Sequence, residues 1–94
     1  MRILQTNTFK KAVKKLHANQ KANLNQAIKA ITANPYIGVA KTGDLFSARI
    51  YKFSLVNQLT LLAYTYNQVD SSIILLALGS HENFYRDLKI INNL

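Results

Sequence analysis

Two residues suited to acid–base chemistry follow the last apolar run of the chain. In "LALGSHENFY", residues 76–85, His81 and Tyr85 are four apart, so a helix opening at Ser80 would present both on one side. Histidine changes its protonation state near neutral pH. Metal-free RNA cleavage needs a base for the 2′-hydroxyl, an acid for the leaving oxygen and positive charge at the phosphorane. The simpler alternative, in which Ser80 is a helix cap and His81 an ordinary surface residue, stays open on the residues alone.

Positive charge for such a site is available in "RIYKF", residues 49–53. Lys52 lies in the middle of an apolar strand, so it either faces solvent or lines a groove. Arg49 marks the start of the strand and is suited to pair with a phosphate or with an acid. The strand tyrosines Tyr51, Tyr64 and Tyr66 are expected to be core or half-buried residues rather than base-stacking platforms.

Metal chemistry is disfavoured by the spacing of the possible ligands. The four acids stand at positions 44, 70, 82 and 87, the two histidines are 64 residues apart, and there is no cysteine. No known metal-binding spacing is present. We therefore expect no metal and no small-molecule cofactor, and we expect His17 to be a charge partner at a helix C-terminus.

The charge balance indicates an anionic partner. Twelve Lys and Arg residues against four acids give a net charge of +8, which favours nucleic acid, an anionic membrane surface or an acidic protein. The longest apolar stretches are well short of the roughly 20 residues needed to span a bilayer. No signal peptide is recognised, and the absence of cysteine fits a cytoplasmic protein.

The elements that must position these residues form two groups within one expected domain, residues 1–94. A short candidate strand lies at 2–6, and apolar spacing then predicts two helices. The first is capped by Thr8 and starts at Phe9. A break near residues 18–20 separates it from the second, which ends at Asn34 and Pro35. Three strands then follow as an antiparallel meander, at 46–55, 59–66 and 72–78, and a last helix is expected at 80–91.

The predicted fold class is therefore α+β. A helical hairpin should pack on a small antiparallel sheet of three or four strands, with a C-terminal helix following the last strand. The lysines of the first helix should form a solvated face that is also able to contact RNA.

Together, this element order and the motifs "KTGDLFSARIYKF", "LLAYTY" and "IILLALGSHENFYRDLK" resemble the RelE/ParE superfamily of bacterial type II toxins. The segment "LALGSHENFY" looks like the ending of YafQ-type ribosome-dependent mRNA interferases. The resemblance implies catalytic roles for His81, Lys52, Arg49 and Tyr85. It also implies RNA contacts by a set of basic residues, Lys10, Lys14, Lys41, Arg86 and Lys89. One departure is Leu61, which stands where RelE has an arginine and favours the histidine-type subgroup.

The resemblance leaves more than one function open. The first is a toxin that cuts mRNA in the ribosomal A site, with ribosome and mRNA as partners. The second is a ParE-like toxin that poisons DNA gyrase by contact alone, since one fold serves both. A basic RNA-binding domain without catalysis is a third. Either toxin implies a cognate antitoxin in the bacterial cytoplasm, with an acidic, partly disordered segment that covers the basic surface.

Overall fold

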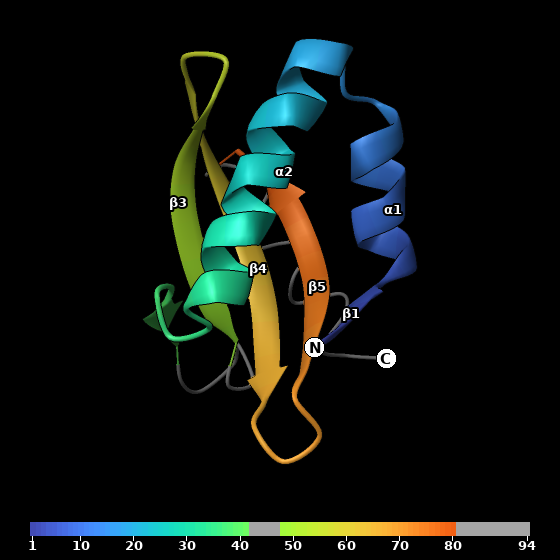
Figure 1. The fold of residues 1–94 in the computed structure, drawn as a ribbon. Helices are drawn as coiled ribbons and strands as arrows, with labels where there is room; N and C mark the ends of the chain where they lie inside the picture. Colours follow the sequence, from blue (N-terminus) through green and yellow to red (C-terminus); the bar gives the residue numbers. More distant parts are fainter. Residues whose placement is uncertain (42–47, 81–94) are drawn as a thin grey trace.

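The computed structural model describes residues 1–41 and 48–80, and these contain two helices and five strands (Figure 1). The predicted helix at 80–91 and the residues His81, Tyr85, Arg86 and Lys89 lie outside the described residues. In chain order the elements are β1 (Arg2–Gln5), α1 (Asn7–Lys14), α2 (Ala18–Ala33), β2 (Val39–Ala40), β3 (Arg49–Leu55), β4 (Gln58–Asn67) and β5 (Ser72–Gly79).

The strands form one mixed sheet with the order β1-β5-β4-β3-β2. The predicted meander of β3, β4 and β5 is confirmed, with antiparallel pairing throughout. The prediction of three or four antiparallel strands was incomplete, because β1 pairs in parallel with β5 at one edge and β2 pairs with β3 at the other. A two-residue strand such as β2 is too short to produce a recognisable alternation.

The first helix begins two residues earlier than predicted, because Thr6 and not Thr8 is its N-cap. The hydroxyl of Thr6 accepts the Phe9 N–H at 3.1 Å and donates to the carbonyl oxygen of Leu76 at 2.6 Å. Thr6 therefore ties the helix start to the neighbouring strand as well as capping it.

The break between the helices also lies earlier than predicted, at residues 15–17. His17 is the N-cap residue of α2, so its predicted role at a helix C-terminus was wrong. Its backbone N–H donates to the side-chain oxygen of Gln20 at 2.7 Å, and satisfying this backbone donor favours starting a helix here. The C-terminal prediction is confirmed, since α2 ends at Ala33, just before Asn34 and Pro35.

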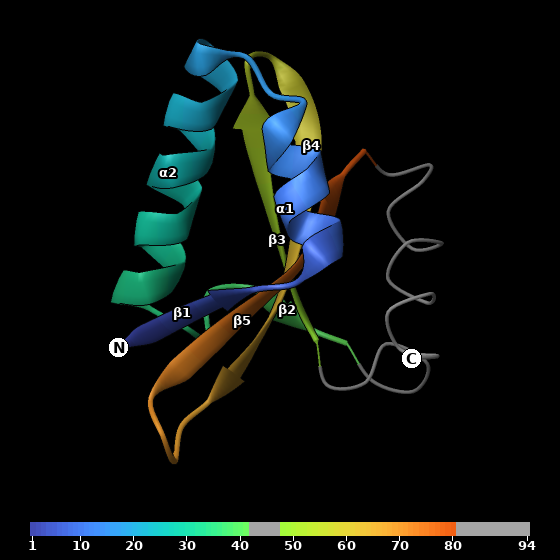
Figure 2. The same cartoon turned by 90° about the vertical axis from the view of Figure 1, so that its right-hand side faces the viewer.

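The larger hydrophobic cluster joins both helices to one face of the sheet. Figure 1 shows α2 in front of the sheet and α1 beside β5, and Figure 2 shows α2 from the side, to the left of the strands. The fully buried side chains of this cluster come from both layers, and they include Phe9, Leu24, Ile31, Leu62, Tyr64, Ile73 and Leu75. This packing fixes the helices against the sheet and provides most of the apolar burial of the described fold.

A smaller buried cluster contains residues from the other face of the three central strands. Ile50, Leu61, Ala63 and Ala77 belong to it, and each is at most 2% exposed. Both faces of the central strands are thus apolar, as their sequences predicted. A register shift follows Ala63, where β5 contributes Leu76 as an extra residue between its pairs with β4.

The β3–β4 hairpin turns through Val56 and Asn57, which have φ angles of 50° and 67°. Two positive φ angles fit the twist of adjacent strands, but they are unfavourable for a β-branched residue such as valine. The side-chain oxygen of Asn23 on α2 accepts the Val56 N–H at 2.8 Å. The turn is therefore held by the helix layer as well as by its own strands.

Candidate functional site

Of the two predicted catalytic residues among the described ones, Lys52 is exposed and Arg49 is half-buried. Lys52 lies in the middle of β3 and pairs across the sheet with Leu61. Leu61 in turn pairs with Gly79. Because directly opposed residues of antiparallel strands point to one face, Lys52 shares the sheet face of the smaller cluster and stands in one row with Gly79.

Gly79 leaves space in this row. No atom of the described residues lies within 4 Å of the position that a Cβ would take there. Two strand spacings separate Lys52 from Gly79, about 10 Å between Cα atoms. Gly79 is the last residue of β5 and is followed by Ser80, so the row ends where the segment containing His81 begins.

Arg49 lies on the opposite face of the sheet from Lys52, since the two residues are three apart on one strand. Its Nη1 donates to the carbonyl oxygens of Gly38 at 2.9 Å and of Tyr36 at 3.3 Å. The guanidinium also lies 5.0 Å from the centre of the Tyr36 ring, a cation–π distance. The described residues therefore give Arg49 a structural role in holding the segment before β2, and they do not bring it together with Lys52.

Tyr64 anchors the same segment from within the core. Its side chain is fully buried, and its hydroxyl donates to the carbonyl oxygen of Pro35 at 2.7 Å and accepts the Gly38 N–H at 3.0 Å. Burial raises the pKa of this hydroxyl above its usual value, although the Gly38 hydrogen bond and the nearby Arg49 charge partly oppose the shift. The expectation that the strand tyrosines are core or half-buried is confirmed, with Tyr51 and Tyr66 half-buried.

Sequence reasoning did not single out Tyr36. It is 53% exposed, its ring meets the Tyr66 ring edge-on at 5.5 Å, and its hydroxyl donates to the side-chain oxygen of Gln68 at 3.2 Å. Its position directly after Pro35 signalled a turn but not an aromatic contact with Arg49. The four residues Tyr36, Arg49, Tyr64 and Tyr66 thus form a connected cluster at the α2–β2 end of the sheet.

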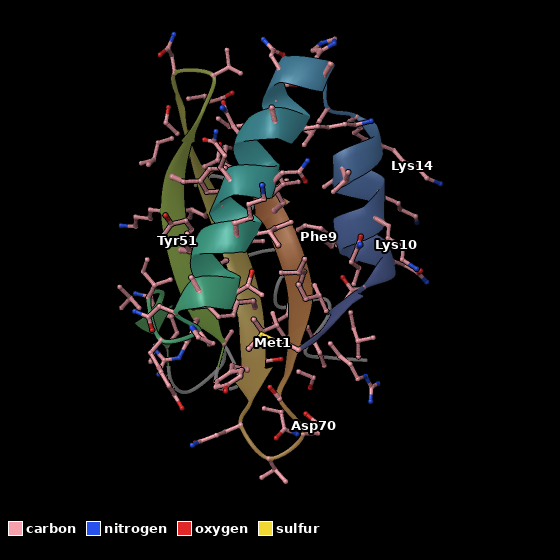
Figure 3. The ribbon with its side chains drawn as sticks, in the orientation of Figure 1. Met1, Phe9, Lys10, Lys14, Tyr51 and Asp70 are labelled. Atoms are coloured by element: carbon pink, nitrogen blue, oxygen red, sulfur yellow. The ribbon has the colours of Figure 1, made fainter. Side chains whose placement is uncertain are left out.

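The basic residues predicted to contact RNA lie at two separate places. Lys10 and Lys14 are exposed on α1 and point away from the sheet (Figure 3). Lys41 is half-buried after β2, and its backbone N–H donates to the carbonyl oxygen of Ala48 at 2.8 Å. These lysines are well placed for an extended polyanion and share no single pocket among the described residues.

A cleft of about 420 Å³ opens between α1, the start of α2 and the far end of the sheet. Apolar side chains line part of it, namely Ala12, Leu16, Leu55 and Leu78. The polar lining includes Lys11 of α1 and Lys15, its C-cap residue, two of the lysines that the sequence predicted to form a solvated face able to contact RNA. The residues at the end of β5, Gly79 and Ser80, also border this cleft.

The sequence matches one family model over residues 3–89, described as the ParE-like toxin of type II bacterial toxin–antitoxin systems. That match covers nearly the whole chain. The chain belongs to this family. It is thus a toxin of the RelE/ParE superfamily, as its motifs predicted. No curated protein matches the sequence.

Two solved structures show the same fold as the toxin. One is the free state of a double arginine-to-alanine mutant of Escherichia coli toxin RelE, with a TM-score of 0.74, 13% identity, and coverage of 99% of this chain and 96% of that one. The other is the intact E. coli RelBE toxin–antitoxin complex, with a TM-score of 0.68, 17% identity, and coverage of 86% and 96%. At these identities the likeness shows the fold alone.

Within residues 1–41 and 48–80 the toxin has no group of three His, Asp or Glu side chains able to hold a metal ion. Neither described helix is long and apolar enough to cross a membrane. Leu61, at the position where RelE has an arginine, is fully buried. In the row formed by Lys52, Leu61 and Gly79, Lys52 is therefore the one residue with a charged or polar side chain.

Proposed function

We propose that this toxin is a metal-independent endoribonuclease that cuts mRNA in the ribosomal A site. The observation that supports it best is the row that places exposed Lys52 level with Gly79 across the sheet. His81 is two residues beyond Gly79, and consecutive Cα atoms are 3.8 Å apart. This short reach along the chain is compatible with His81 and Lys52 acting on one phosphate.

In this mechanism His81 exchanges a proton with the 2′-hydroxyl or the leaving oxygen, and Lys52 stabilises the negative charge of the phosphorane. Tyr85 positions the nucleotide. Lys10, Lys14, Lys41, Arg86 and Lys89 contact RNA outside the reacting phosphate. Arg49 enters the mechanism indirectly, because its guanidinium is bonded to the segment before β2 on the other face of the sheet.

The test is a cell-free translation reaction with purified toxin, in which the 5′ ends of the mRNA are mapped by primer extension. We expect internal cuts only when ribosomes are translating, and loss of the cuts in His81→Ala and Lys52→Ala. Lys29→Ala removes an equally exposed lysine from α2 and should leave the cuts in place. Intact mRNA with the unsubstituted toxin at concentrations that arrest translation would refute the proposal.

Arg49 needs a separate control, since its loss affects folding as well as charge. Arg49→Lys keeps the charge but cannot make both carbonyl contacts and the ring contact at once. We expect it to lower the unfolding midpoint while the cut pattern is kept below that midpoint. A variant that is stable but inactive would instead place Arg49 at the reacting phosphate.

A second candidate function is poisoning of DNA gyrase by protein contact. The family description as ParE-like specifically favours it. Inhibition of gyrase supercoiling by the toxin, unchanged in His81→Ala and accompanied by intact mRNA, would establish this alternative.

In both cases we propose a cognate antitoxin as the partner, by analogy with the RelBE complex, in the bacterial cytoplasm. The described residues contain ten Lys and Arg side chains but only one acid, Asp70. An acidic antitoxin segment would compensate this charge. Its release by increasing salt in a pull-down measurement checks the electrostatic part of that interaction.

A further inference from the structure

The cleft beside α1, which meets the Lys52 row only at Gly79, has the chemistry of a nucleotide site. Its volume of about 420 Å³ falls in the lower part of the range of about 300–1,000 Å³ typical of small-molecule sites. It lies on the helix side of the sheet, because its lining residues Leu55 and Leu78 belong to the larger hydrophobic cluster. Lys52 is on the opposite face and does not line it.

Positive charge is concentrated at one wall of this cleft. Lys11 in α1 and Lys15, the C-cap residue that continues the helical backbone, are four residues apart and lie on the same side of the helix, and both are exposed. The single acid among the described residues, Asp70, lies in the β4–β5 turn at the other end of the sheet (Figure 3). No described carboxylate therefore lines the cleft to neutralise the two ammonium groups.

The remaining lining combines an apolar surface with groups that donate and accept hydrogen bonds. Ala12, Leu16 and Leu78 offer an apolar surface for a base, and Gln20 and Gln58 contribute side-chain amides. The buried Thr60 hydroxyl donates to the carbonyl oxygen of Gln58 at 3.1 Å and retains only its capacity to accept. The Gln20 oxygen is already used by the His17 N–H, which leaves its amide N–H groups as donors. A base edge needs both donors and acceptors, whereas an acidic peptide side chain needs donors only.

We propose that this cleft binds one nucleotide of a single-stranded RNA, with its phosphate on Lys11 and Lys15 and its base against the apolar lining. The site adjoins the proposed reacting phosphate at Gly79 and Ser80 but uses other charged groups, Lys11 and Lys15 in place of Lys52 and His81. It depends neither on His81 nor on the ribosome, so it stands whether or not the toxin cuts mRNA.

The test is direct binding of a fluorescein-labelled tetraribonucleotide to the purified toxin, without ribosomes, measured by fluorescence anisotropy. We expect Lys11→Ala/Lys15→Ala to weaken binding about tenfold. The slope of log K against log salt should fall by about 0.7 in this variant, since the two lysines neutralise one phosphate and each neutralised phosphate on a single strand contributes about 0.7. Lys21→Ala/Lys29→Ala removes two exposed lysines of α2 that do not line the cleft, and it should change affinity less than threefold. Equal losses in the two double variants would overturn the proposal in favour of diffuse charge attraction.

A second measurement locates the ligand and separates its parts. Amide NMR shifts at Thr8, Lys11 and Gln20 should move with the tetraribonucleotide and with adenosine 5′-monophosphate, but not with inorganic phosphate at the same concentration. His81→Ala should show the same shifts. Equal shifts with inorganic phosphate would show that the cleft binds any anion. Competition by oligoglutamate at equal affinity would show that the cleft binds an acidic peptide. Either result overturns the nucleotide site.

Discussion

The hydroxyl of Tyr64 donates to the carbonyl oxygen of Pro35 at 2.7 Å, which joins the middle of the sheet to the chain just after α2. The same hydroxyl accepts the Gly38 N–H at 3.0 Å. A buried side chain thus satisfies two backbone groups in a segment without helix or strand pairing of its own. This contact connects the helix layer to the edge of the sheet.

Replacing Tyr64 by phenylalanine should therefore lower the free energy of unfolding by about 1–3 kcal/mol, because the two backbone groups lose their partner in a buried place. Urea unfolding followed by circular dichroism measures this change. Tyr66→Phe is the matched control, since no hydrogen bond of the Tyr66 hydroxyl is found among the described residues, and it should change stability by less than about 0.5 kcal/mol. Equal effects of the two substitutions would show that the Tyr64 hydroxyl adds nothing.

Stability should also depend on pH through Tyr64. Burial raises the pKa of its hydroxyl above the ordinary value of 10.0, so the folded state holds this proton more tightly than the unfolded chain. Its contribution is complete below pH 10 and is lost as the pH rises through the folded-state pKa. Urea midpoints between pH 8 and 11 should fall above pH 10, and the fall should be smaller in Tyr64→Phe. A fall of the same size in both proteins would contradict this assignment.

Gly38→Ala should destabilise the fold by about 1–3 kcal/mol through overpacking. A Cβ there would lie 2.9 Å from the ring carbon Cε1 and from the hydroxyl oxygen of Tyr64, and 3.2 Å from the Cβ of Arg49. Gly79→Ala is the control, because no described atom lies within 4 Å of its added Cβ. Thermal unfolding should show a clear decrease in Tm for the first substitution and little change for the second.

Val56→Asn should raise the free energy of unfolding by about 0.5–1 kcal/mol. The φ of 50° at Val56 is unfavourable for a β-branched side chain, whereas asparagine adopts this region readily. The backbone N–H that donates to Asn23 is unchanged by the substitution. Val69→Asn changes another exposed loop valine, one without a positive φ, and should leave the urea midpoint unchanged. A matching gain there would show that replacing an exposed apolar side chain by a polar one, and not the φ angle, causes the effect.

The central strands and the end of α2 were predictable from the sequence because local signals determine them. Alternating side chains marked β3, apolar runs marked β4 and β5, and proline ended the second helix. The start of α1 was not predictable, since Thr6 is favoured over Thr8 by a hydrogen bond to Leu76, 70 residues away. The pairing of β1 with β5 likewise depends on tertiary contacts.

The candidate site also has one part that the sequence predicts and another that depends on how distant elements pack. The exposure of Lys52 followed from a lysine in an alternating strand. The position of Arg49 over Tyr36 and the contribution of Lys11 and Lys15 to a cleft depend on how distant elements pack. Sequence spacing places residues on the face of an element, but it does not show what lies opposite that face.

The parallel pairing of β1 with β5 affects when the toxin can fold during its synthesis. Among the described strands, β1 leaves the ribosome well before β5, residues 72–79, which is the one strand that it pairs with. The sheet cannot be completed until those residues have been synthesised, and its long-range pairing makes this step late in folding. A nascent toxin therefore cannot complete its sheet for most of its own translation, so it should remain inactive until most of the chain has been made.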